Sequence, residues 1–281
     1  MNWLIFALAF WLAAWAANVT MARSKWSDTA LVRYAVPIIF GMTLLVAWEA
    51  LVHSFNVSAA ILPAPSAVAD TFANSTGLLW VDFKQTVLKG ALSGYFIGAG
   101  AAFVMAVLID RSPFLTRGLL PIGNFVAALP IVGIAPILVS WFGFDWQSKA
   151  AVVVVMVFFP VLVNTVQGLR ETDAMLRDLM KTYAAGYFKT LWKLRIPAAM
   201  PFIFNGLKVG ATLALIGAIV AEYFGSPTRG MGFRISTGVG SLSIDLVWAE
   251  IAVAALAGTM FYGVVAWIEK KVTFWHPSQR G

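Results

Sequence analysis

Long, continuous apolar runs constrain this chain more than any other feature of its sequence. The first, NWLIFALAFWLAAWAANVT at residues 2–20, carries no charged residue. A transmembrane α-helix needs about 20 such residues to cross the hydrocarbon core of a bilayer. A transmembrane β-strand would instead need about 10 residues of alternating polarity. The sequence therefore predicts an all-α integral membrane protein.

The overall composition supports the same class. Of the 281 residues, 60% are hydrophobic and 12% are charged, whereas roughly a quarter are charged in ordinary soluble domains. A formal charge of +7 would also suit a nucleic-acid-binding protein, but lysine and arginine sorted to one side of a membrane give the same total. The chain has no cysteine, which excludes disulfides and thiol chemistry.

The apolar runs predict about seven transmembrane helices. Their approximate ranges are 2–20, 32–52, 85–109, 118–141, 150–167, 202–220 and 246–268. No basic residue precedes the first run, so we expect an uncleaved helix with its N-terminus outside, the alternative being a cleaved signal peptide. In the polar segment 54–83, Ser66 is expected to cap a short surface helix with Asp70 in its first turn. Residues 223–245 are expected to form a glycine-rich loop.

The basic residues orient these helices. With the N-terminus outside, fourteen lie on the cytoplasmic side: Arg23, Lys25, Arg33, Arg111, Arg117, Arg170, Arg177, Lys181, Lys189, Lys193, Arg195, Lys270, Lys271 and Arg280. Five lie on the other side: Lys84, Lys89, Lys149, Arg229 and Arg234. This bias follows the positive-inside rule. It predicts a cytoplasmic C-terminus, a cytoplasmic segment 170–201 and an outer segment 223–245.

Glycines at four-residue spacing mark two of the predicted spans. They are Gly90, Gly94 and Gly98 in the third span and Gly206 and Gly210 in the sixth. Residues at this spacing share one helix face, and small side chains there let a neighbouring helix approach closely. We expect close packing at these positions rather than glycine tolerated for flexibility.

Prolines mark the predicted span at residues 118–141. Pro121, Pro130 and Pro136 each remove a hydrogen-bond donor and disturb the preceding turn, so this helix is expected to be kinked or broken. A broken helix at membrane depth must be shielded by protein or line a cavity. Pro130 and Pro136 are therefore candidates either for the wall of a pathway or for core packing.

Sequence motifs for chemistry are sparse. There is no G-x-x-x-x-G-K-[ST] phosphate loop, and the two histidines, His53 and His276, are far apart. Glu49, Glu222 and Glu250 fall near the outer ends of spans, where we expect them to reach water or headgroups, and Lys208 is expected to extend back to the cytoplasmic surface. The lack of midplane charge argues against an ion-coupled carrier.

One long segment is hydrophilic: RETDAMLRDLMKTYAAGYFKTLWKLRIPAAMP, at residues 170–201. Residues 173–183 have helix-forming composition, 184–186 indicate a turn, and 187–195 indicate a second helix before Pro197. Its basic residues suit an amphipathic helix resting on lipid headgroups. A helix presented to a partner protein is the alternative, and residue chemistry leaves both open.

This segment resembles the EAA loop of binding-protein-dependent ABC importer permeases, whose pattern is E-A-A, three residues, Gly, nine residues, I-x-L-P. Leu194-Arg195-Ile196-Pro197 matches the end of that pattern, which places Asp178-Leu179-Met180 at E-A-A and Ala184 at the glycine. Leu179, Met180 and Ala184 depart from the small residues of the pattern, so the turn is expected to pack differently. Gly186 is expected to take over part of the glycine's role.

Three further stretches are similar to the nitrate, sulfonate and taurine permease branch, which also includes permeases for thiamine-precursor pyrimidines and flavins. They are LPAPSAV at 62–68, ALPIVGIAPILVSWFG at 128–143 and AEYFG at 221–225. The resemblance covers roughly residues 61–268. It implies a MetI-like permease domain at 61–281, with residues 1–60 as N-terminal transmembrane helices, the first of them additional to the usual core.

The resemblance implies a type I ABC importer transmembrane domain in the bacterial cytoplasmic (inner) membrane, with no enzyme site, metal or cofactor on this chain. Two copies, or two related chains, would form a pathway along their interface, with the glycines and prolines above as candidate packing or pathway residues. A coupling helix at about 178–188 would enter a groove of a separate ATPase that binds ATP and Mg, and a solute-binding protein would deliver the cargo. The ATPase-coupling residues would be Asp178, Leu179, Met180, Tyr183, Ala184, Ala185, Gly186 and Phe188.

Rival classes are an ATP-independent carrier or channel and a structural membrane subunit. Within the importer class, similarity of the stretch YFGSPTRGMGFRIST favours a heterocyclic vitamin precursor, such as a thiamine-related pyrimidine or riboflavin, as the cargo. A sulfonate, taurine or nitrate is the alternative.

Overall fold

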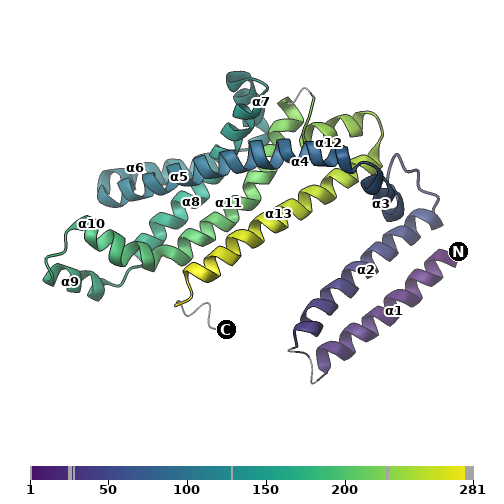
Figure 1. Cartoon of the computed structure of the whole chain (residues 1–281), viewed down its shortest axis with the longest axis horizontal. Helices are drawn as coiled ribbons and strands as arrows, with labels where there is room; N and C mark the ends of the chain where they lie inside the picture. The colour runs from purple at the N-terminus through teal and green to yellow at the C-terminus, as the bar shows by residue number, and fades with distance from the viewer. Residues whose placement is uncertain (1, 25–26, 28, 128, 226–227, 276–281) are drawn as a thin grey trace. The chain divides into compact units, whose positions relative to one another are not determined.

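The computed structural model describes residues 2–24, 27, 29–127, 129–225 and 228–275, and within these ranges every regular element is a helix (Figure 1). The chain divides into two units. One comprises Met1–Thr76 with Thr237–Glu250, and the other comprises Gly77–Ser236 with Ile251–Gly281. The division passes through the last helix, α13 (Ile244–Val272).

Six helical stretches in the described residues are long and apolar enough to cross a membrane. They are Trp3–Arg23, Ala30–Ser54, Thr76–Arg111, Trp146–Arg170, Tyr187–Gly225 and Ile244–Val272. The all-α membrane fold is therefore confirmed. The fourth predicted span is instead two shorter helices, α6 (Pro113–Ala127) and α7 (Ile131–Phe142), which are separated next to Pro130.

The first unit contains α1 (Asn2–Arg23), α2 (Ala30–Ser54) and α3 (Pro65–Asn74), with α1 packed along α2. The carboxylate of Glu49 on α2 accepts hydrogen bonds from the Ser66 amide at 3.0 Å and the Ser66 hydroxyl at 2.7 Å. The expectation that Ser66 caps α3 is wrong, because the helix starts at Pro65 with Ala64 as its N-cap and has no acidic residue in its first turn.

The second unit begins with one continuous helix of 36 residues, built from α4 (Thr76–Phe83), the π-helical segment η1 (Lys84–Ala91) and α5 (Leu92–Arg111). It starts nine residues before the expected position, 85, because the preceding stretch TGLLWVDF is itself apolar and helical. Its partners are α8 (Trp146–Arg170) and α11 (Ile196–Gly225), and α8 packs extensively against both α5 and α11 (Figure 1).

Both glycine rows lie against α8. A Cβ atom built on Gly94 would lie 2.5 Å from the Cβ of Val153, and one built on Gly206 would lie 3.1 Å from the Cα of Val161. The remaining row members also face α8: the Cβ position of Gly90 is 3.4 Å from Lys149 Cβ, that of Gly98 is 3.1 Å from Val154 Cα, and that of Gly210 is 3.2 Å from Val157 Cγ1. Helices in a bilayer associate mainly through such close packing, because lipid offers no hydrophobic contrast. Any part these glycines take in a pathway stays a prediction.

Three ionisable residues in the spans are placed differently from expectation. Glu222 and Glu250 are 1% and 0% exposed, so they are buried in protein instead of reaching water or headgroups. Lys208 on α11 forms an ion pair of 2.6 Å with Glu269 on α13 instead of extending to the surface. Burial of a charge in a membrane domain is costly unless a partner is supplied, and the partner of Lys208, Glu269, is distant in sequence.

Residues 223–245 are not a loop throughout, because they contain the helix α12 (Met231–Gly240). The sequence does not indicate this helix, because glycines stand at 230, 232, 238 and 240 and glycine is a poor helix former. The amides at its start are bound by side chains more than 140 residues earlier, those of Asp82 and Thr86. Such long-range capping stabilises a helix that local propensity would not predict.

Candidate functional site

The hydrophilic segment folds into a short helix, α9 (Ala174–Thr182), followed by α10 (Tyr187–Thr190) and the π-helical segment η2 (Leu191–Arg195), which runs into α11. The helix expected at 173–183 is therefore confirmed, with Asp173 as the N-cap, whose carboxylate accepts from the Met175 amide at 2.8 Å. The expected coupling range 178–188 is not one helix, because α9 ends at Thr182 and α10 starts at Tyr187, and its role in coupling stays a prediction. The π-helical turn precedes Pro197, whose ring would clash with the carbonyl four residues before it.

The turn after α9 is a Schellman motif centred on Ala184. The Ala184 amide donates to the Lys181 carbonyl at 2.9 Å, and the Ala185 amide donates to the Met180 carbonyl at 3.0 Å. Ala184 has a φ of 49°, in the left-handed region. The residue aligned with the EAA glycine therefore occupies the position that favours glycine. Gly186 does not take over this conformation, since its φ is −67°.

The surface of α9 is apolar on one face. Met175, Leu179 and Tyr183 recur every four residues and are 76%, 49% and 73% exposed. Phe188 on α10 is 59% exposed. An apolar face of this kind on a polar segment suits a docking surface for a partner protein, and it also suits a helix that rests on lipid headgroups. We call Met175, Leu179, Tyr183 and Phe188 the α9 surface.

Asp178 lies on α9 outside this row of apolar residues. Its carboxylate accepts a hydrogen bond of 2.8 Å from Lys181, one turn on. That hydrogen bond, together with the charge of Lys181, lowers the pKa of Asp178 below its ordinary value. Both side chains are largely exposed, 69% for Asp178 and 77% for Lys181, so the pair contributes little to stability but keeps the carboxylate charged.

A largely buried ion pair anchors the segment that follows α9. Arg195 at the end of η2 donates through two nitrogens to the two oxygens of Asp110 at the end of α5, at 2.6 Å and 2.7 Å. It also donates to the Leu169 carbonyl at the end of α8 at 2.8 Å, and the Tyr187 hydroxyl donates to Asp110 at 2.9 Å. Bidentate arginine–carboxylate pairs fix orientation as well as distance. The ends of α5 and α8 and the start of α10 are therefore tied into one block.

Aromatic contacts extend this block toward the α9 surface. The guanidinium of Arg111 lies 5.7 Å from the ring centre of Tyr187 and 5.8 Å from that of Phe188. Phe188 is thus linked through Arg111 to the last turn of α5. We call Asp110, Arg111, Leu169, Tyr187 and Arg195 the α9-end cluster, although none of the five residues lies on α9 itself.

Sequence reasoning identified α9 and its turn but missed this cluster. Asp110 and Arg195 lie 85 positions apart, and each is explained by itself as a charge at the end of a span. A signal was present in Arg195, which sits inside the matched L-R-I-P end of the loop. No pattern in the sequence indicates that its partner is Asp110.

A second polar cluster lies at the start of α12. Asp82 on α4 accepts from the Gly230 amide at 2.7 Å and from Arg234 at 2.9 Å. Thr86 on η1 accepts from the Met231 amide at 2.8 Å and donates to Glu222 on α11 at 2.6 Å. Asp82, Thr86 and Glu222 are all buried. We call Asp82, Thr86, Glu222, Gly230 and Arg234 the α12-end cluster.

A buried lysine lies next to this cluster. The Lys149 ammonium, with 1% of the residue exposed, donates to the Gly225 carbonyl at the end of α11 at 2.8 Å and also to the Phe144 carbonyl. A cation at a helix C-terminus satisfies carbonyls that have no amide partner. Lys149 is therefore buried within the protein, and its expected position on the outer side of the membrane stays a prediction.

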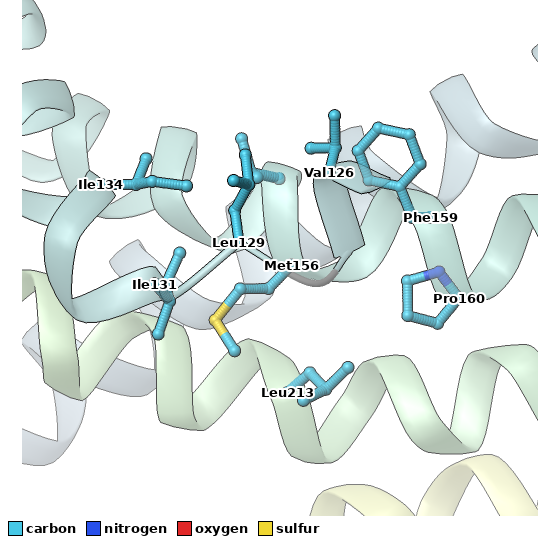
Figure 2. Close-up of a pocket in the computed structure, with 9 residues that line it drawn as sticks. Val126, Leu129, Ile131, Ile134, Met156, Phe159, Pro160 and Leu213 are labelled. Atoms are coloured by element: carbon cyan, nitrogen blue, oxygen red, sulfur yellow. The ribbon is translucent and has the colours of Figure 1, made fainter. Parts of the chain in front are cut away.

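The break between α6 and α7 borders a cavity of about 170 Å³ (Figure 2). Its walls come from both sides of the break and from the middle of α8 and α11: Val126, Leu129, Ile131, Met156, Phe159 and Leu213 are among them. Pro160 also lines it. The expected broken helix thus lines a cavity, as helix breaks at membrane depth are expected to do. Whether Pro130 and Pro136 border a pathway stays a prediction.

Comparison with known proteins places this arrangement in a family. Residues 94–274 match the family of binding-protein-dependent transport system inner membrane components. A probable ABC transporter permease protein of Haemophilus influenzae is 31% identical over 240 residues, which cover 84% of this chain and 96% of that protein.

Several relatives have names that mention a cargo. The riboflavin transport system permease protein RibX of Chloroflexus aurantiacus is 31% identical over 84% of this chain and 88% of its own length. The putative aliphatic sulfonates transport permease protein SsuC of Bacillus subtilis is 29% identical over 85% of this chain and 86% of its own length. Further relatives are named for formylaminopyrimidine, taurine and bicarbonate transport. The chain therefore belongs to the binding-protein-dependent ABC importer permeases of type I.

Proposed function

We propose that this permease forms the translocation pathway of its importer and receives the driving motion at the α9 surface from a separate ATPase. One observation carries the proposal: the segment that directly follows an exposed apolar helix face is fixed to the membrane helices by a largely buried, bidentate ion pair. A docking surface transmits force only if it is held rigidly, and the α9-end cluster supplies that connection.

In this proposal the ATPase subunits bind ATP and Mg, and their closure moves α9 together with the ends of α5 and α8. Differential contacts at α9 in the two ATPase states would shift the permease between inward-open and outward-open states. The bias of fourteen basic residues against five supports a cytoplasmic α9 and an outer N-terminus, in a bacterial cytoplasmic membrane.

Exposed apolar side chains on α6 and α7 support a pathway between two copies of the chain. Phe125, Ile137 and Trp141 are 68%, 49% and 74% exposed, and they flank the helix break. A second copy packed there would enclose the pathway, and a solute-binding protein would deliver the cargo at the opposite end from α9.

For the cargo, we propose an uncharged heterocycle such as a thiamine-related pyrimidine or riboflavin. Relatives named for riboflavin and formylaminopyrimidine support this class. The relatives named for sulfonates, taurine and bicarbonate define the alternative, a small charged solute. Titration of the purified binding protein with both classes separates them, since a site for one class rejects the other.

The docking proposal is tested by Leu179→Arg in the α9 surface. A charge there would be desolvated on docking, so co-purification of the ATPase should fall about tenfold or more, with a matching loss of uptake. The matched control is Glu171→Arg, which places the same side chain on the exposed loop before α9. Equal co-purification with Leu179→Arg and the unsubstituted chain would overturn the proposal.

A further inference from the structure

The cavity at the α6–α7 break lies near the middle of the membrane-crossing helices. Met156 on α8 is ten residues after Trp146 and fourteen before Arg170, or about 15 Å and about 21 Å along the axis. Leu213 is close to the middle of α11, Ile196–Gly225. Since the hydrocarbon core is about 30 Å thick, the cavity lies at roughly half its depth.

The walls of this cavity are apolar. In Figure 2, Ile131 and Leu129 stand on one side, Leu213 stands on the other, and the thioether of Met156 extends between Ile131 and Leu213. The lining residues contain no charged side chain. An anion entering such a space would lose its hydration without gaining a partner, which costs at least several kcal/mol. An uncharged ring would instead gain contact with the thioether and with Phe159.

A hydrogen-bond acceptor borders these apolar walls. Pro160 has no amide hydrogen, so the carbonyl of Met156, four residues earlier, lacks its α-helical donor. A proline inside a continuous helix such as α8 frees a carbonyl in this way, and a neighbouring side chain, a water or a bound ligand can then donate to it. An amino or ring N–H group on an otherwise apolar ring matches this combination.

The size of the cavity limits the number of rings. Its volume of about 170 Å³ is close to that of an apolar cavity of about 150 Å³ that binds benzene in another protein. One six-membered ring fits within this space, whereas a fused three-ring system would extend out of it.

We propose that this cavity is a binding site within the membrane for an uncharged, single-ring, N–H-bearing heterocycle of the pyrimidine type. The site deepens the proposed function, because it rests on the chain forming a pathway for such a cargo. Among the relatives' named cargoes, it selects the formylaminopyrimidine chemistry over riboflavin and over sulfonate, taurine or bicarbonate.

The absence of cysteine from the sequence makes the site directly testable. Met156→Cys, in the full importer reconstituted in lipid, is treated with a small neutral thiol reagent. Near saturation, 4-amino-2-methylpyrimidine should slow modification about tenfold. Benzenesulfonate, a single ring with a charge, and riboflavin, a three-ring system, should not. Val209→Cys, one turn before Leu213 on α11, is the matched control and should be insensitive to all three compounds.

Several outcomes would overturn the site. These are no protection by the pyrimidine, equal protection by benzenesulfonate or riboflavin, and equal protection of Val209→Cys. Modification of Met156→Cys that is blocked in the assembled importer but open in the isolated chain would also overturn it, since a second copy or a partner would then fill the cavity.

A filled-cavity variant separates this site from the proposed function. Leu213→Trp should reduce uptake of the pyrimidine cargo about tenfold or more, with ATPase co-purification and ATP hydrolysis retained, whereas Val209→Trp should transport normally. Full uptake by Leu213→Trp would overturn the site and leave the importer intact. An unsubstituted chain that neither recruits an ATPase nor transports would instead overturn the proposed function.

Discussion

The α9-end and α12-end clusters both join a buried aspartate to an arginine, but they hold their partners differently. Asp82 and Asp110 stand 28 residues apart on the continuous helix Thr76–Arg111, or about 42 Å along its axis. That exceeds the hydrocarbon thickness of about 30 Å. The two clusters therefore lie at opposite sides of the membrane.

The difference lies in what each carboxylate binds. The carboxylate of Asp110 accepts hydrogen bonds from two guanidinium nitrogens of Arg195 and from the Tyr187 hydroxyl, and both residues belong to the segment that follows α9. Asp82 receives one arginine nitrogen and the backbone amide of Gly230, while Glu222 beside it keeps one oxygen, Oε1, buried without a hydrogen-bond partner. The first arrangement resists rotation and suits transmission of motion. The second caps the start of a short helix, α12.

The largest effect is expected from breaking the first pair with Arg195→Met. Asp110, whose side chain is 6% exposed, would remain buried without its counter-charge. Removing one partner of a buried pair costs about 3–5 kcal/mol. Thermal or denaturant unfolding of the purified permease should show that loss, and uptake should fall with it.

Two variants sharpen this result. Lys193→Met, an exposed lysine two residues earlier, should leave both stability and uptake close to those of the unsubstituted chain. Asp110→Leu combined with Arg195→Met should restore much of the stability, because an apolar pair replaces the charges. If the double variant also restored uptake, the pair would serve stability alone and its role in transmission would be refuted.

The next effect concerns the second cluster and uses Gly230→Ala. Gly230 has a φ of 115°, and a Cβ there would collide with the carboxyl group of Glu222. We expect a loss of about 2–3 kcal/mol, seen as faster hydrogen exchange across α12. ATPase co-purification should be unchanged, because α9 is at the other side of the membrane.

Gly240→Ala is the matched control at the far end of α12, where a Cβ would meet nothing within 4 Å. It should leave the exchange rates of α12 nearly unchanged. Loss of ATPase binding in Gly230→Ala, with no such loss in Gly240→Ala, would show that the two clusters are coupled. It would refute the view that only the α9-end cluster affects the ATPase.

How far the sequence predicts this structure depends on how local each determinant is. The spans, the helix break at Pro130 and the helix at 173–183 depend on apolar runs, proline chemistry and composition, which can be read within a short window. The α9 turn also follows from a local motif, since the residue aligned with the EAA glycine, Ala184, is the one with left-handed φ.

Determinants that join distant segments could not be predicted in this way. The helix α12 was expected to be a loop because its glycines outweigh local propensity, and its amides are bound by Asp82 and Thr86. The pairing of Asp110 with Arg195 and of Lys208 with Glu269 requires the packed fold. The burial of Glu222 follows for the same reason, since a carboxylate near a span end can turn to lipid headgroups or to protein.

A smaller effect is expected at the α9 turn. Ala184→Gly removes the cost of a left-handed alanine, which is about 1 kcal/mol, while keeping the Schellman hydrogen bonds. Amides near the end of α9 should exchange several-fold more slowly, with uptake unchanged. Ala185→Gly, whose residue has no left-handed φ, is the control and should give no protection. Equal exchange in Ala184→Gly and the unsubstituted chain would contradict the role assigned to this turn.

The smallest effect is a pH dependence confined to α9. The hydrogen bond from Lys181 lowers the pKa of Asp178, so the folded state binds a proton less readily than the unfolded state at this carboxyl group. The contribution is therefore fully present above the ordinary aspartate pKa of about 3.9, and it is lost as the pH falls through the lower folded value.

Protection factors of α9 amides, corrected for intrinsic exchange, should thus be constant from neutral pH to mild acid and should decline only below the ordinary aspartate value. Lys181→Met should shift that decline to higher pH, since it removes the donor. Lys189→Met, which removes an exposed lysine of α10, should not. A decline that begins at the same pH in the Lys181→Met variant as in the unsubstituted chain would show that Asp178 is not the group that titrates.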